Sequence, residues 1–183
     1  DYGMAEDKVF VTTCGTGFDA LIAEQFATAG KRGFKTYVEK FFQDVLTYQP
    51  ENYVINVNDA QGANENEDEN KIEKKAFLIT FANANQWGND AFIAPKASMQ
   101  DGQMDICMLS SSALLGAPGL ALRLFTKMID SSLFVDVVKA KDVTLVREHE
   151  APFHIDGDPV DMPKDIHIRI DEDGLKVLVE KRF

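Results

Sequence analysis

The sequence predicts one α+β domain, residues 1–183, that is mainly β: an antiparallel, sandwich-like arrangement of strands with about three helices. Three observations lead to this prediction. The second half of the chain reads as a run of strands with few helices between them. Asp-Gly pairs at 156–157 and 173–174 are typical of hairpin turns. A length of 183 residues with 45% apolar residues suits a single domain with a substantial core.

The first third of the chain should supply two of the helices. Residues 8–13 (KVFVTT) are apolar and rich in β-branched side chains, which indicates a buried strand ended by the glycines that follow. A short helix should come next and stop at Gly30. A second helix is expected after Gly33, because Phe and Val residues recur at helical spacing from there to Val45.

In the middle of the chain the spacing of apolar residues changes from helical to every second position. Apolar residues alternate with more polar ones over 53–58, which indicates a half-buried strand. Residues 58–70 (NDAQGANENEDEN) contain five acids and no base, so we expect a solvated hairpin loop. Further strands are expected at 75–82 and 103–109.

A third helix is expected around Pro118, a residue favoured in the first turn of a helix. Leu120, Leu124 and Met128 would form its buried stripe. The remaining segments all read as strands: 133–140, 142–148, 152–156, 165–170 and 175–181.

Composition excludes several functional classes. The formal net charge of −11 argues against duplex nucleic acid or an anionic membrane as the main partner. No apolar run reaches the roughly 18 residues of a membrane span, and the first residues do not form a signal peptide. Two cysteines, Cys14 and Cys107, cannot make a disulfide framework, so we expect a reducing, cytoplasmic compartment.

The first candidate motif is Gly15–Ala20 (GTGFDA), which follows a strand and opens a helix. It matches the G-x-G-x-x-A form of a dinucleotide-binding turn. The acid expected about 20 residues later, at the end of the next strand, is missing. The alternative is a tight turn from strand to helix, with Asp19 as the cap of the helix.

The second candidate is His154–Pro159 (HIDGDP). On an extended chain His154, Asp156 and Asp158 would share one face. Two carboxylates at a hairpin tip could bind Mg²⁺, or one could act as a general base. The alternative is an Asp-Gly turn whose acids face water.

The third candidate is the long polar loop from Asn83 to Asp105, which contains the single Trp of the chain, Trp87. Loops of this length are often functional. The alternative is a long connection in which Asp101-Gly102 is a simple turn. The three histidines lack the spacing of a zinc site, and the chain has no P-loop.

Taken in order, these features resemble the C-terminal domain of the diacylglycerol kinase and sphingosine kinase family, close to its bacterial lipid-kinase branch. The residues that carry the resemblance are Gly17–Ala20 (GFDA), Gly33 with Tyr37, the loop NANQWGNDAFIAPKASMQDGQMDI at 83–106, and Asp156-Gly157-Asp158. The resemblance covers nearly the whole chain.

The resemblance implies a lipid kinase that uses ATP and Mg²⁺. Enzymes of this family have two domains: an N-terminal domain with a Gly-Gly-Asp-Gly-Thr nucleotide loop, and a C-terminal β-sandwich that supplies lipid-site and catalytic residues. No Gly-Gly-Asp-Gly-Thr occurs in this chain. We therefore expect the nucleotide-binding domain to be missing from these 183 residues and the chain alone to be inactive.

The resemblance also implies roles for five residues. Gly17 and Asp19 would lie near the lipid head group, and Asp101, with carbonyls of its loop, would match a structural Mg²⁺ site. Asp156 would face the nucleotide phosphates and their Mg²⁺. Asp158 would be the base that takes the proton of the lipid hydroxyl, at a position where the family usually has Glu. An Asp is shorter by one methylene, and a base must come within about 2.6–3.2 Å of its proton, directly or through one water.

The partners expected from this resemblance are a lipid alcohol, ATP held by the other domain, and peripheral contact with the inner membrane face, without nucleic acid. The loop also departs from the family, because Trp87-Gly88-Asn89 replaces a run of glycines. A second hypothesis is a non-catalytic β-domain that binds a lipid or another apolar ligand. The sequence leaves open which lipid would be bound.

Overall fold

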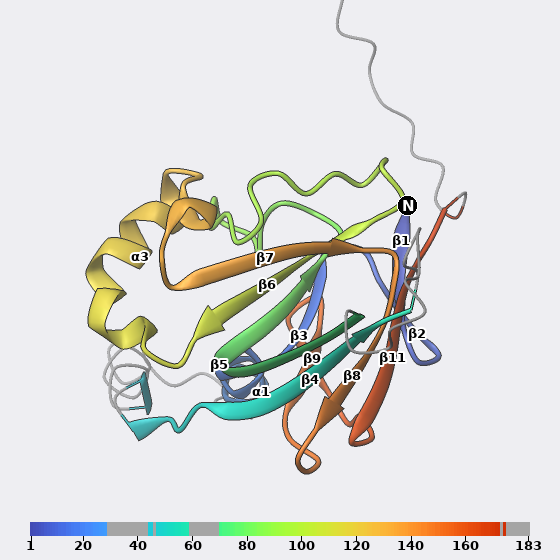
Figure 1. Cartoon of the computed structure of the whole chain (residues 1–183), viewed down its shortest axis with the longest axis horizontal. Coiled ribbons are helices and arrows are strands. Elements are labelled where there is room, and N and C mark those ends of the chain that lie inside the picture. Colours follow the sequence, from blue (N-terminus) through green and yellow to red (C-terminus); the bar gives the residue numbers. More distant parts are fainter. Residues whose placement is uncertain (29–43, 46, 59–69, 173, 175–183) are drawn as a thin grey trace, which may run out of the picture.

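The computed structural model describes residues 1–28, 44–45, 47–58, 70–172 and 174. Within them, eleven strands form one sheet, accompanied by two α-helices and two 3₁₀-helices (Figure 1). In chain order the elements are β1 (Tyr2–Ala5), β2 (Lys8–Phe10), β3 (Thr13–Gly17), α1 (Phe18–Thr28), β4 (Glu51–Val57), β5 (Lys71–Ala82), β6 (Met104–Ser110), η2 (Ala113–Gly116), α3 (Ala117–Phe125), η3 (Ile129–Ser131), β7 (Val135–Ala140), β8 (Asp142–Arg147), β9 (Phe153–Ile155), β10 (Asp158–Val160) and β11 (Asp165–Asp171).

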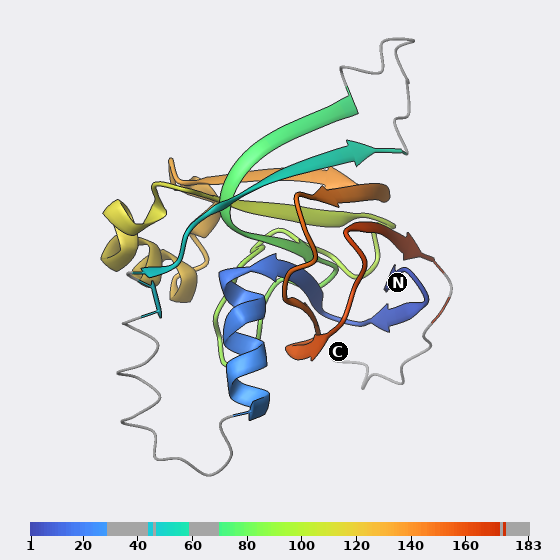
Figure 2. The ribbon, with the colours of Figure 1, turned by 90° about the horizontal axis from the view of Figure 1, so that it is seen from below.

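The sheet branches at β5. Along the main path the strand order is β10-β9-β3-β5-β4-β8-β11-β1-β2, while β6 pairs with β5 and β7 pairs with β6. The first half of β5 pairs with β4, and its second half pairs with both β3 and β6. The register shifts between Ala76 and Leu78, and such bulges bend strands at the corners of sandwiches. The sheet therefore folds over on itself, and α1 projects away from it (Figure 2).

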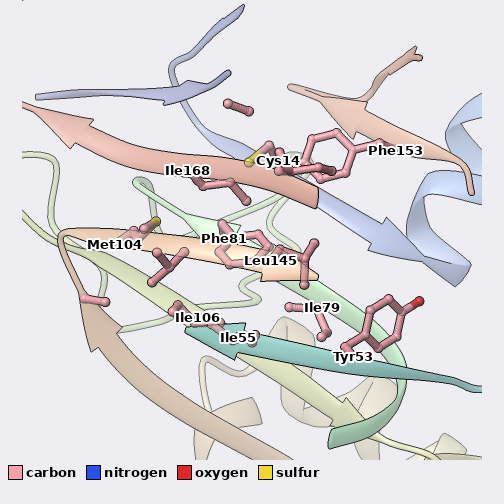
Figure 3. Packing of buried hydrophobic residues seen from close by; sticks show 14 of the residues in the cluster. Cys14, Tyr53, Ile55, Ile79, Phe81, Met104, Ile106, Leu145, Phe153 and Ile168 are labelled. Atoms are coloured by element: carbon pink, nitrogen blue, oxygen red, sulfur yellow. The ribbon is translucent and has the colours of Figure 1, made fainter. Parts of the chain in front are cut away.

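The main core lies between the strands of the folded sheet. Its side chains come from β1 to β11, and Figure 3 shows Cys14 and Phe153 from β3 and β9 gathered with Phe81 and Leu145 from β5 and β8. All four of these residues are fully buried. A smaller cluster around Phe18, Phe77 and Leu78 lies at the start of α1.

The predicted fold class is confirmed: the chain is mainly antiparallel β with a sandwich-like sheet. Two α-helices are described instead of about three, because most of the helix expected from Gly33 to Val45 lies outside the described residues. The acidic loop, except for its end residues, and the strand expected at 175–181 also lie outside them.

Several boundaries were predicted wrongly. The expected strand 8–13 is two strands, β2 and β3, because the chain between them turns its backbone amides towards Asp156 instead of a neighbouring strand. The glycines expected to end that strand lie inside β3. Met128 is 52% exposed and follows the end of α3, so it is not part of a buried stripe. The short strands β1 and β10 were not predicted.

Candidate functional site

Asp156 occupies the tip of the β9–β10 hairpin with a φ of +50°, a conformation that Asp tolerates better than most residues. Its Oδ1 accepts hydrogen bonds from the amide of Thr12 (2.7 Å), the hydroxyl of Thr12 (2.6 Å) and the amide of Thr13 (3.1 Å). Its Oδ2 accepts one from the amide of Val11 at 2.8 Å. Burial alone would raise the pKa of Asp156, but these bonds to the charged form lower it overall. The carboxylate therefore fixes the hairpin to the β2–β3 turn.

Asp158, two residues later, is the first residue of β10 and is exposed. Within the described part of the chain its carboxylate makes no hydrogen bond or ion pair. The expectation that His154, Asp156 and Asp158 share one face is wrong, because the turn at Asp156-Gly157 breaks the alternation of side chains. His154 is 3% exposed and belongs to the interior, whereas Asp158 faces solvent.

Asp19, in the first turn of α1, is joined to the hairpin through His154. Asp19 Oδ1 accepts the amide of Ala20 at 2.8 Å, and Oδ2 lies 2.9 Å from the hydroxyl of Thr80 and 3.1 Å from Nε2 of His154. Nδ1 of His154 accepts the amide of Gly157 at 3.4 Å. This pattern requires the imidazole tautomer with the proton on Nε2, which then donates to Asp19. The start of α1 and the hairpin tip are thus connected by side-chain hydrogen bonds.

Gly15 and Gly17 let β3 approach its neighbours closely. A Cβ on Gly15 would lie 2.6 Å from the carbonyl oxygen of Ile79 and 2.9 Å from Oδ2 of Asp19. Gly17 has a φ of +99°, and a Cβ there would lie 2.8 Å from Cα of Leu78. The glycines therefore serve packing and the strand-to-helix turn. Because β3 pairs antiparallel with β5 and β9, the motif does not belong to the parallel unit of a dinucleotide-binding fold.

Arg147 is a site-supporting residue that sequence reasoning missed. It is 1% exposed, and its guanidinium donates to the carbonyls of Ala151 (2.7 Å), Met162 (2.9 Å) and Pro163 (2.7 Å). These carbonyls lie at the two ends of the segment that carries the β9–β10 hairpin. Burial lowers the pKa of Arg147. The alternation of buried residues along β8 was the signal that could have placed Arg147 inside.

Asp101 lies away from the hairpin, in the loop before β6. Its Oδ2 forms an ion pair with Nζ of Lys139 at 2.6 Å, and Lys139 lies 3.8 Å from Oδ1 of Asp105. Asp105 is 3% exposed and its Oδ2 has no hydrogen-bond partner, and burial raises its pKa. Asp105 and Lys139 line a cavity of about 320 Å³. In this structure the ammonium of Lys139 neutralises the two carboxylates, and the role of Asp101 towards Mg²⁺ stays a prediction.

The carboxylate of Asp156 is largely occupied by donors from the protein. Of its four donors, three bind Oδ1 and one binds Oδ2, so one lone-pair position of Oδ2 remains. The role of Asp156 towards Mg²⁺ stays a prediction. Across the residues that the structure describes, no three acidic, His or Cys side chains are grouped as metal ligands.

The structure thus brings four of the five candidate residues into one region and leaves one apart. Gly17, Asp19, Asp156 and Asp158 lie around β3, the start of α1 and the β9–β10 hairpin. Asp101 lies beside β7, in contact with Lys139. No helix within the described ranges combines the length and apolar character that crossing a bilayer requires.

Comparison with solved structures supports the fold. Three structures from Bacillus anthracis str. Sterne match. Two are of proposed diacylglycerol kinases, with TM-scores of 0.63 and 0.60 and identities of 18% and 22%, and one is of a diacylglycerol kinase, with a TM-score of 0.55 and 18% identity. They cover 93%, 93% and 92% of this chain, which spans 52%, 53% and 50% of theirs. No curated protein sequence matches the chain.

A family model matches residues 12–179, which is most of the chain and includes β3, α1 and the β9–β10 hairpin. Its description is the YegS C-terminal NAD kinase beta sandwich-like domain. The chain therefore belongs to the family of YegS C-terminal, NAD kinase β-sandwich-like domains.

Proposed function

We propose that the chain is the lipid-side domain of an ATP-dependent lipid kinase, which transfers the γ-phosphoryl group of ATP to a lipid hydroxyl. The observation that carries the proposal is the contrast within the β9–β10 hairpin. Asp156 and His154 are held by hydrogen bonds to the β2–β3 turn and to α1, while the carboxylate of Asp158 is exposed. A rigid support for one free carboxylate is the arrangement that a general base requires.

In this mechanism Asp158 accepts the proton of the lipid hydroxyl while the hydroxyl oxygen attacks the γ-phosphorus. The bond from that phosphorus to the bridging oxygen breaks, and ADP leaves. MgATP enters as the co-substrate and supplies the charge neutralisation of phosphoryl transfer. Because the chain spans about half of the structures it matches, we assign nucleotide binding to residues outside it.

Asp19 and Asp156 have supporting roles in the proposal. Three donors surround the carboxylate of Asp19, whose side chain is 11% exposed. Direct contact with a lipid head group is therefore limited to its small exposed part, and its main contribution is to hold His154. Asp156 sets the backbone at the hairpin tip, two residues before Asp158. Contact with the membrane that contains the lipid would be peripheral.

The test is an activity assay of the complete gene product with radiolabelled ATP and a panel of lipids: diacylglycerol, a sphingoid base and phosphatidylglycerol. Asp158→Asn should lower kcat by roughly 10²–10⁴-fold, the usual contribution of a general base. Its melting temperature should stay unchanged, because the side chain is exposed. Asp161→Asn, which removes an exposed carboxylate three residues away, is the matched control and should keep the wild-type rate.

Wild-type turnover by Asp158→Asn would exclude Asp158 as the base. If the complete gene product binds these lipids without phosphorylating any of them, the chain is a non-catalytic binding domain. This second function is favoured by one observation: position 158 is an Asp, one methylene shorter than the Glu that the resemblance leads us to expect.

A further inference from the structure

The outer surface of the segment around α3 is unusually apolar. The structure describes eight large hydrophobic side chains as exposed, and five of them fall between residues 115 and 133. Their exposed fractions run from 52% for Met128 to 100% for Leu133. We call this set the α3 surface; its members are Leu115, Leu122, Phe125, Met128 and Leu133. Large exposed apolar patches on a protein surface mark interaction sites, and these five side chains, carried by η2, α3 and the segments beside them, are candidates for one.

The helix itself is apolar on both sides. Leu120 and Leu124 face inward and pack with a core cluster that includes Val135. Leu122 and Phe125 face outward and are 67% and 59% exposed. Helices that are apolar all round are normally covered on all sides. The outward side of α3 should therefore meet a partner that is itself apolar.

The charges around the α3 surface differ from those of the whole chain. Residues 111–135 contain two bases, Arg123 and Lys127, and one acid, Asp130, in a chain with 19 bases and 30 acids. Asp130 is neutralised by Lys96, 2.7 Å away. Exposed Leu and Phe side chains beside Lys and Arg, without a free acid, are typical of segments that lie in the interface of a lipid bilayer.

Aromatic residues of the neighbouring loop adjoin α3. The amide of Phe92 donates to the carbonyl of Leu124 at 2.9 Å, and Nζ of Lys127 lies 4.3 Å from the centre of the Phe92 ring. Trp87, which is 37% exposed, begins the turn that ends at Ala91, just before Phe92. Trp is a side chain that favours the boundary between water and lipid.

The α3 surface belongs to the same end of the sheet as the start of α1. Gly17, Leu78 and Leu109 stand side by side in the register of β3, β5 and β6. Helix α1 begins directly after Gly17, and η2 begins shortly after β6 ends. Leu114 of η2 packs against the cluster that contains Phe18 at the start of α1. A bilayer in contact with α3 would thus lie at the end of the domain where α1 begins and Asp19 is located.

We propose that the α3 surface is a membrane-docking face, on which Leu122, Phe125, Met128 and Leu133 enter the boundary between head groups and acyl chains. Arg123 and Lys127 then lie at the level of the lipid phosphates. The choice of a bilayer over another apolar partner rests on the proposed function, since a lipid kinase must reach a substrate whose acyl chains stay in the membrane. Apolar insertion drives the binding, because the net charge of −11 opposes attraction to an anionic surface.

The test is co-sedimentation of the protein with vesicles of phosphatidylcholine, alone and mixed with phosphatidylglycerol. Leu122→Ser and Phe125→Ser should each lower the partition coefficient roughly tenfold, since each removes one large buried apolar group from the lipid. Val9→Ser is the matched control. Val9 is 52% exposed on β2, the last strand of the main path and not a neighbour of β6 or β7, and its loss should leave binding unchanged.

Trp87 provides a second readout, because it is the only Trp of the chain. Vesicles with brominated acyl chains should quench its fluorescence, and Phe125→Ser should reduce that quenching. Circular dichroism confirms that each variant remains folded.

Three results would overturn the proposal: absence of wild-type binding to both kinds of vesicle, equal loss of binding in Val9→Ser, or a wild-type dimer that Phe125→Ser dissociates while no vesicle is bound. In the last case a second copy of the chain covers the surface. Vesicle binding needs no ATP, so a complete gene product that binds vesicles but phosphorylates no lipid would refute the proposed function and leave the docking face intact.

Discussion

Replacing Arg147 by Met tests whether this buried guanidinium holds the β9–β10 hairpin in place. Arg147 makes three hydrogen bonds of 2.7–2.9 Å to the carbonyls of Ala151, Met162 and Pro163. A hydrogen bond to a charged group contributes about 1.5–3 kcal/mol, and a buried carbonyl left without a donor costs about 1–3 kcal/mol. These terms are not additive, and Met keeps part of the apolar packing. We expect the free energy of unfolding to fall by about 3–5 kcal/mol.

Urea unfolding followed by far-UV circular dichroism measures this loss, with an unchanged m-value as the sign that both proteins unfold in the same way. Arg169→Met is the matched control. Arg169 lies on the adjacent strand β11, its side chain is 36% exposed, and its Nε forms an ion pair with Oδ1 of Asp171 at 3.6 Å. Its loss should cost less than about 0.5 kcal/mol. A loss below about 1 kcal/mol for Arg147→Met would refute the argument from unpaired carbonyls.

Three other predictions concern the same region and the core. The lowered pKa of Asp156 means that its stabilisation is present above the ordinary value near 3.8 and is lost as pH falls through the lower folded value. The unfolding free energy of Asp156→Asn should therefore be lower than wild type at neutral pH and depend less on pH below about 4; parallel acid titrations of the two proteins would contradict this. Gly17→Ala should lower the free energy of unfolding in urea by about 2 kcal/mol or more, because Gly17 has a φ of +99° and lies close to the backbone of Leu78. An equally stable variant would mean that β3 and β5 can separate. Burial raises the pKa of both Cys14 and Cys107, so Ellman's reagent should label neither thiol in the native protein and both in urea; prompt native labelling would show that the core opens.

Local patterns in the sequence predict much of this fold. Alternation of apolar residues predicts β4, because Tyr53 and Ile55 both point into the core. The Asp-Gly pair predicts the β9–β10 hairpin. Pro118 marks the first turn of α3. Each of these signals is complete within a few residues, and for this reason single-sequence reasoning can find them.

The site depends on contacts that no local pattern contains. Asp156 is held by amides of Val11, Thr12 and Thr13, which lie more than 140 residues earlier in the chain. The bond between Asp19 and His154 spans 135 residues. The sequence marks these acids as candidates, but only the folded sheet shows that Asp156 is held by donors and that Asp158 has none among the residues that the structure describes.

The branching of the sheet at β5 has a consequence for how the protein folds. The single strand β5 is hydrogen-bonded to β4, β3 and β6. The two halves of the folded sheet therefore cannot form or unfold independently of each other. The partners of β5 come from both earlier and later parts of the chain, and closing such distant loops is slow. Folding should therefore take milliseconds to seconds in one cooperative step, and the amides of β5 should be among the last to exchange their hydrogens with solvent.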